Sequence, residues 1–213
     1  MHSLTPKEIS NVVYAFGQNN IANRRLMQSY KKAIDNKISG FEYNSDSCHK
    51  ILLGWILSRN YTAEDQEFWD KLLNRILQDL ESLRPEQLTK LYYNIYGKNL
   101  AALEFEYKPE IEEEIYKRAE SLDFPQLVQV LATFKFIDKK VGDERLEQAI
   151  KEYIPKMIPQ ETAYFLRYFL NSKTDMGFSD GVYQKLESTI MEDAGEMNAD
   201  ELSVTYSSLA LSK

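Results

Sequence analysis

The stretch LTPKEISNVVYAFGQNN, from Leu4 to Asn20, decides the fold because related stretches recur along the chain. Each begins with an anchor residue, continues through a short polar or proline-bearing step, and ends in an apolar run followed by polar or basic residues. The six anchors are separated by 39, 40, 39, 35 and 40 residues, a spacing typical of repeat proteins. The other five stretches are YNSDSCHKILLGWILSRN from Tyr43, LRPEQLTKLYYNIYGKN from Leu83, LDFPQLVQVLATFKFID from Leu122, MIPQETAYFLRYFLNSK from Met157 and MNADELSVTYSSLALSK from Met197.

Aligned on their anchors, these stretches share apolar columns at helical spacing, which predicts one amphipathic helix in each. Proline at or near the first turn marks the start of several of them, since its missing N–H needs no partner there. Trp55 and Phe134 lie on the apolar stripe, and we expect them among the most buried side chains. The column five residues after the anchor holds Ile9, Cys48, Leu88, Leu127, Thr162 and Leu202, and the column twelve after it holds Phe16, Trp55, Ile95, Phe134, Phe169 and Leu209.

A second amphipathic segment follows each of the first five helices, and no stretch alternates as a strand would. A pair of helices is too thin to bury its own apolar faces and becomes stable only when neighbours stack on it. The pattern therefore predicts an all-α fold, a right-handed α-solenoid with a period of about 39 residues, formed by one domain over 1–213. Its repeats are 4–42, 43–82, 83–121, 122–156 and 157–196 with a half repeat at 197–213, and the second helices are expected at 22–38, 64–80, 109–120, 143–156 and 179–193.

Composition limits the possible functions. The chain of 213 residues has 26 basic and 33 acidic side chains, for a net charge of −7. No apolar run reaches the length of a membrane span, so none is expected. The single cysteine, Cys48, excludes a disulfide framework and is expected in the core.

Catalytic signals are absent from the sequence. Of the two histidines, His49 is next to Cys48, and two adjacent helical residues cannot both face one metal ion. No Gly-x-Gly or Gly-Lys-Ser motif is present to cradle a phosphate. We therefore expect no enzyme activity, no metal, no cofactor and no small-molecule substrate.

The repeat resembles a known class. Its opening Leu-x-Pro-x-x-Leu/Ile, with middles such as VVYAFGQNN, ILLGWILSRN and VLATFKFID, resembles the heptatricopeptide and octotricopeptide repeats found with FAST-kinase-like and RAP-domain proteins of mitochondria and chloroplasts. The resemblance implies a mitochondrial location, with a cytoplasmic one as the alternative. It also implies a role in the processing, stability or translation of organellar RNA.

For such a role, RNA would contact the ends of the first helices of each repeat, where polar and basic residues gather. Stacking would bring these residues onto one edge of a solenoid. Cations at helix C-termini also interact favourably with the helix dipole, so a purely structural role for them stays open. The candidate RNA-binding residues are Arg59, Asn60, Lys98, Asn99, Lys139, Lys140 and Lys173.

The acidic net charge favours a protein partner over RNA, because a surface that follows phosphates is usually basic. Aromatic rings outside the stripe, such as those of Tyr93, Tyr96 and Tyr164, are suited to a protein interface. In the last repeat, Leu202, Tyr206 and Leu209 have no second helix to cover them. The leading hypothesis is a scaffold or accessory subunit in a larger organellar assembly, with Leu202, Tyr206, Leu209, Tyr93 and Tyr96 as candidate contacts, and the alternative is an organellar RNA-binding protein that takes single-stranded RNA.

Overall fold

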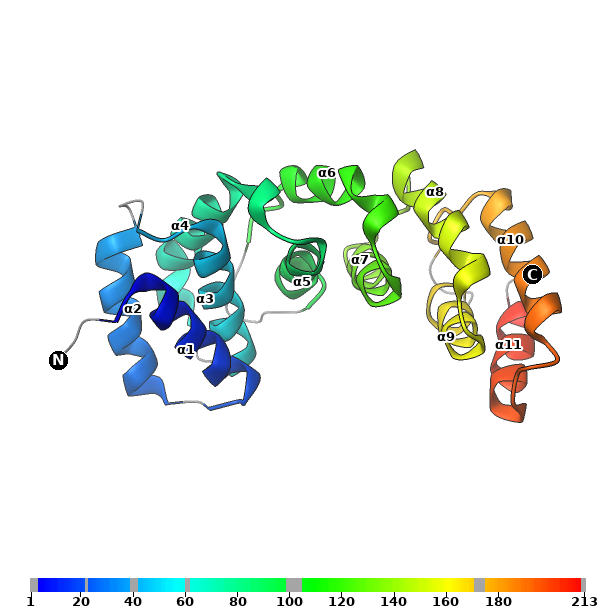
Figure 1. Ribbon diagram of the computed structural model, residues 1–213, viewed down its shortest axis with the longest axis horizontal. Coiled ribbons are helices and arrows are strands. Elements are labelled where there is room, and N and C mark those ends of the chain that lie inside the picture. The colour runs from blue at the N-terminus through cyan, green and yellow to red at the C-terminus, as the bar shows by residue number, and fades with distance from the viewer. Residues whose placement is uncertain are drawn as a thin grey trace. The chain divides into compact units, whose positions relative to one another are not determined.

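The computed structural model describes residues 4–21, 23–38, 42–59, 62–98, 105–170 and 175–211, and every regular element in these ranges is a helix (Figure 1). This confirms the all-α class. The described ranges hold four short 3-10 helices, η1 (Ala63–Asp65), η2 (Leu80–Ser82), η3 (Ala119–Ser121) and η4 (Ile154–Lys156). They also hold eleven α-helices: α1 (Pro6–Gln18), α2 (Arg24–Ile38), α3 (Ser45–Ser58), α4 (Gln66–Leu77), α5 (Pro85–Tyr96), α6 (Pro109–Lys117), α7 (Phe124–Phe136), α8 (Glu144–Tyr153), α9 (Pro159–Phe169), α10 (Asp180–Asp193) and α11 (Ala199–Leu211).

Five of the six helices that follow an anchor begin with the same local geometry, and the exception is α3, where the Asn44 side chain accepts from the Ser47 N–H. After η2, η3 and η4, the backbone N–H of the anchor (Leu83, Leu122 or Met157) donates to the carbonyl three residues earlier over 3.1 Å. The residue after the anchor then donates its N–H to a Glu or Gln side chain three residues further on, which satisfies a donor that the helix itself leaves unpaired. These pairs are Thr5–Glu8 at 2.7 Å, Arg84–Gln87 at 3.0 Å, Asp123–Gln126 at 3.3 Å, Ile158–Glu161 at 3.3 Å and Asn198–Glu201 at 2.8 Å.

The chain divides into two compact units, which are described separately. The first unit comprises 1–95 and 99–114, and the second comprises 96–98 and 115–213. Helix α6 begins in the first unit, and its last three residues belong to the second.

In the first unit, α1 and α3 cross at very short range. A Cβ placed on Gly17 would lie 2.3 Å from the Gly54 carbonyl oxygen, and one on Gly54 would lie 2.5 Å from the Val13 carbonyl oxygen. Only glycine allows two helix backbones to approach this closely. Next to this crossing, the rings of Trp55, Phe68 and Trp69 meet edge to face with centroids 5.0–5.8 Å apart, joining α3 to α4.

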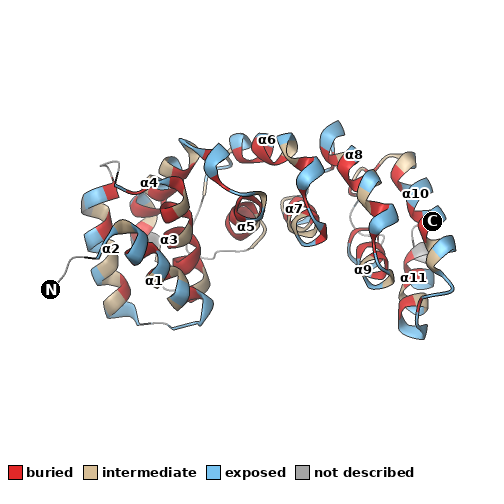
Figure 2. Ribbon diagram, in the orientation of Figure 1, coloured by how far each residue is buried: buried red, intermediate tan, exposed pale blue. Residues whose placement is uncertain are grey.

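The second unit is built around α9, which packs against both α7 and α11. Phe134 and Phe165 are fully buried in its core, and Phe178, before α10, lies with its ring centroid 5.8 Å from that of Phe165. The loop before α8 is tied to the segment before α10 by a 2.7 Å hydrogen bond from the Val141 N–H to the Met176 carbonyl. The buried faces of the helices are seen in Figure 2.

Burial follows the predicted stripe in most helices but not in α2. Trp55 and Phe134 are 1% and 0% exposed, which confirms that they belong to the core. On α2, the spacing of Leu26, Tyr30 and Ile34 at four-residue intervals predicts that these side chains form the buried face. The structure instead buries Met27, Ile34 and Ile38, and leaves Leu26 and Tyr30 half-exposed.

Candidate functional site

The two side chains that are chemically most reactive, those of Cys48 and His49, are buried in the core. In the part of the chain that the structure describes, no three His, Cys, Asp or Glu side chains come together to hold a metal ion. Cys48 is fully buried, and burial raises the pKa of its thiol to about 12, so the thiolate nucleophile does not form near neutral pH. His49 is buried as well, with its Nε2 2.9 Å from the Gln87 carbonyl oxygen. Both side chains therefore belong to the core of the first unit.

The residues proposed from the sequence as protein contacts differ widely in exposure. Tyr206 is 71% exposed on α11, whereas Leu202 is half-buried and the Leu209 side chain lies outside the described residues. On α5, Tyr93 is half-buried. Tyr96 is buried and so offers little surface to a partner.

The buried side of α11 explains why Leu202 is only partly available. Helix α11 packs on α9, and its covered side chains are Glu201, Thr205 and Ser208. The pattern had suggested an apolar side without a cover. Among the described side chains of α11, the buried ones are polar, and Tyr206 is exposed.

The proposed RNA-binding residues are only partly described, since Asn60, Asn99 and Lys173 lie outside the described ranges. Arg59 is exposed at the end of α3 in the first unit, where its φ of 54° places it in the left-handed region. In the second unit, Lys98 is half-exposed, Lys139 lies over the Phe134 ring at 5.4 Å, and Lys140 forms an ion pair with Asp175. Both lysines at the end of α7 therefore have intramolecular partners.

A more coherent surface lies on α9. Its inner side, which includes Phe165, Leu166 and Phe169, is buried. At helical spacing, the opposite side carries Tyr164, Arg167 and Tyr168, all of which are exposed. Lys135, at the end of α7, is also exposed and contacts Tyr168, and we call these four residues the α9 face.

Contacts within the α9 face fix its side chains. The rings of Tyr164 and Tyr168, one helical turn apart, have centroids 4.2 Å apart, and the Arg167 guanidinium lies 5.7 Å from the Tyr168 ring centroid. The Lys135 ammonium donates a 2.7 Å hydrogen bond to the Tyr168 carbonyl near the C-terminal end of α9. This lysine links α7 to α9.

The base of the α9 face is also aromatic. The Phe124 ring meets Tyr164 edge to face at 6.1 Å and stacks on Tyr153 at 6.2 Å. The exposed tyrosines are therefore held against a packed aromatic layer, which lowers the entropy that they lose when a partner covers them. Sequence reasoning singled out Tyr164 but missed Arg167 and Tyr168, although their spacing of three and four residues from Tyr164 places them on the same side of a helix.

Comparison with protein-family models and with curated proteins gave no match for this chain. Within the described ranges, no helix has the length and apolar character that crossing a membrane requires.

Proposed function

We propose that this chain is a non-catalytic helical-repeat protein that docks another protein on the α9 face. The observation that carries the proposal is the exposed Tyr164–Tyr168 pair with Arg167 beside it. Tyrosine and arginine are the residues that most often dominate binding energy at protein interfaces, above all when they are held rigidly before binding.

The repeat architecture is part of this proposal. We take the helix pairs to be units of a right-handed α-solenoid with a period of about 39 residues. The shared helix start, with its anchor and its Glu or Gln side chain, supports a common unit. Solenoids present extended surfaces without a catalytic cleft, which suits a scaffold or accessory subunit. The resemblance of the repeat to organellar helical repeats favours a mitochondrial assembly.

RNA binding is the second candidate, and the same surface favours it on one point. Two exposed aromatic rings next to Arg167 and Lys135 are groups on which single-stranded bases stack. Against it stand the net charge of −7 and the ion pair that already occupies Lys140. A protein partner therefore remains the preferred proposal.

Site-specific photocrosslinking of the full chain in its native cells tests the proposal. With a photoreactive phenylalanine at position 168, we expect a protein adduct of discrete mass that resists ribonuclease. The same group at position 107, another exposed tyrosine, is the matched control and should not give this adduct. Arg167→Glu should abolish the adduct without changing the helix content. A ribonuclease-sensitive adduct would replace the proposal with RNA binding, and equal adducts at both positions would reject the α9 face.

A further inference from the structure

Positive charge in this acidic chain is concentrated on α2. Between Arg24 and Ile38, five basic side chains accompany a single acidic one. Two of the five have acidic partners, since Lys31 pairs with Asp65 and Lys37 lies 3.4 Å from Glu42. Among the described residues, Arg24, Arg25 and Lys32 form no ion pair and are exposed. We call these three residues the basic face of α2.

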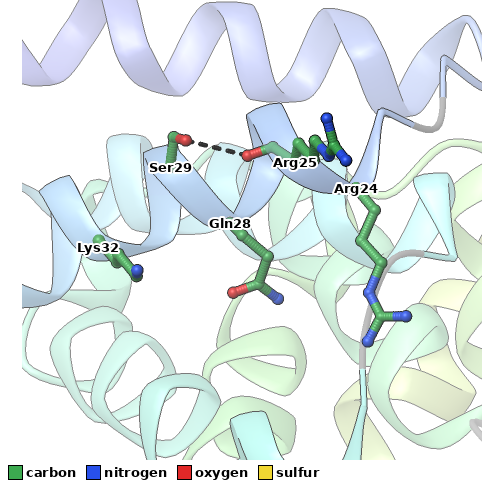
Figure 3. Close-up of a pocket in the computed structure, with 5 residues that line it drawn as sticks. All are labelled: Arg24, Arg25, Gln28, Ser29 and Lys32. Atoms are coloured by element: carbon green, nitrogen blue, oxygen red, sulfur yellow. Dashed lines mark hydrogen bonds between the residues drawn. The ribbon is translucent and has the colours of Figure 1, made fainter.

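The basic face of α2 lines an open groove of about 590 Å³, together with Gln28 and Ser29 (Figure 3). On a helix of 3.6 residues per turn, the three cations fall within an arc of about 100° and extend along the axis for about 12 Å. The Ser29 hydroxyl donates to the Arg25 carbonyl over 3.0 Å, so Gln28 is the polar side chain left to accept or donate in the groove. The groove therefore suits a short acidic surface.

Acidic charge without basic charge is found in another segment of the chain. From Leu186 to Ser212 there are six acidic side chains and no Lys or Arg. Glu187, Glu192 and Glu196 are exposed and form no ion pair among the described residues. Glu187 and Glu192 lie in the second half of α10 and Glu196 follows it in a turn, and we call these three residues the acidic end of α10. Met191, 81% exposed, lies among them and gives this surface an apolar centre.

We propose that the basic face of α2 in one copy of this chain docks on the acidic end of α10 in a second copy. The two surfaces are opposite in charge, and all six of their side chains are exposed and form no ion pair among the described residues. Each copy carries one surface of each kind, so the contact is head to tail, and such contacts propagate into rings or filaments. A single-stranded RNA fits the groove less well, because none of the described residues that line it is aromatic and able to stack on a base.

The proposal does not depend on the proposed function, because it uses none of the residues of the α9 face. Local charge complementarity must overcome the repulsion between two copies that each carry −7, so the contact is expected to be weak and sensitive to salt. Self-association should appear at low ionic strength and high protein concentration, and it should vanish as salt screens the facing charges.

Charge reversal on each surface tests the proposal by analytical ultracentrifugation of the full chain. One variant carries Arg24→Glu, Arg25→Glu and Lys32→Glu, and the other carries Glu187→Lys, Glu192→Lys and Glu196→Lys. Each alone should associate at least about tenfold more weakly than the unaltered chain. An equimolar mixture of the two should regain association, because an intact acidic end then meets an intact basic face. Circular dichroism confirms that both variants fold.

The mixture makes the test specific. Loss of association in each variant with recovery on mixing supports the proposal. A monomeric unaltered chain at low salt, or a mixture that stays monomeric, overturns it. Retained association in either variant also overturns it, as does binding of a labelled single-stranded RNA to the basic face without self-association. Tyr164→Ala with Tyr168→Ala should leave self-association unchanged, which separates this proposal from the function of the α9 face.

Discussion

At the scale of single residues, His49 on α3 contacts α5 through one of its ring nitrogens. The other ring nitrogen has no hydrogen-bond partner. Because a carbonyl can only accept, its Nε2 donates to the Gln87 oxygen, and Nδ1 keeps a lone pair in the core. Burial lowers the pKa of His49 to about 4, although the hydrogen bond to the Gln87 carbonyl acts to raise it. Protonation would place a charge and an unpaired N–H in the interior, so the imidazole stays neutral in the folded chain.

This predicts a stability loss on mild acidification. The unfolded chain takes up a proton near pH 6.5, whereas the folded chain resists it until about pH 4, so the free energy of unfolding falls as pH drops through this window. The full effect is roughly 3 kcal/mol. Urea unfolding at several pH values between about 7 and 5 measures it.

His49→Gln should remove most of this slope, while Ser58→Ala, at another buried polar side chain, should lower stability equally at every pH. Asp46 does not interfere in this window. Burial acts to raise its pKa, but hydrogen bonds from Lys50 and Gln87 outweigh burial and lower it, so its contribution is lost only at more acidic pH. An unchanged slope in His49→Gln would contradict the assignment.

At the scale of elements, the closest helix contact in the first unit depends on two glycines. Alanine at Gly54 would gain helix propensity, worth roughly 1 kcal/mol, but its methyl group would meet the Val13 carbonyl at 2.5 Å. Because that obstacle is backbone, relief requires a shift of a whole helix. We expect Gly54→Ala to lower the free energy of unfolding by about 1–3 kcal/mol, as overpacked cores do.

Gly142→Ala is the matched control, since a Cβ there would meet nothing within 4 Å. Chemical denaturation of the two variants gives the comparison, with Gly142→Ala expected to stay near the unaltered chain. A Gly54→Ala chain as stable as the unaltered protein would show that α1 and α3 separate easily.

The elements also show how far sequence reasoning reaches. Helix positions followed from the apolar period, since each stripe must face a core. The register of α2 did not, because RRLMQSYKKAI offers two overlapping stripes, one through Leu26 and Tyr30 and the other through Met27 and Ile34. Only packing against its neighbours selects between them. Sequence reasoning found only part of the α9 face for a similar reason. The contact between Tyr164 and Tyr168 depends on their rotamers as well as on their spacing in the sequence.

At the scale of the whole molecule, the proposed repeat of about 39 residues predicts that the chain tolerates the loss of one complete repeat. Five of the six anchors, Tyr43, Leu83, Leu122, Met157 and Met197, are buried, so each begins its helix from an equivalent environment. Deleting 122–156 joins Ser121 to Met157 and replaces one buried anchor by another. The stability of stacked repeats is approximately the sum of the stability of each repeat and of the contacts between neighbouring repeats. The shortened chain should therefore still fold.

The matched control removes a single helix of the same unit. Deleting 143–156 takes away α8 and η4, so that α7 is followed directly by α9 and the buried side chains of Leu146 and Ile150 are lost. Thermal unfolding followed by circular dichroism should then show a cooperative transition for the chain without 122–156 and a broad, early one for the chain without 143–156. The smaller deletion is expected to do more damage because stacking requires whole helix pairs, and equal damage from the two would contradict a repeat of about 39 residues.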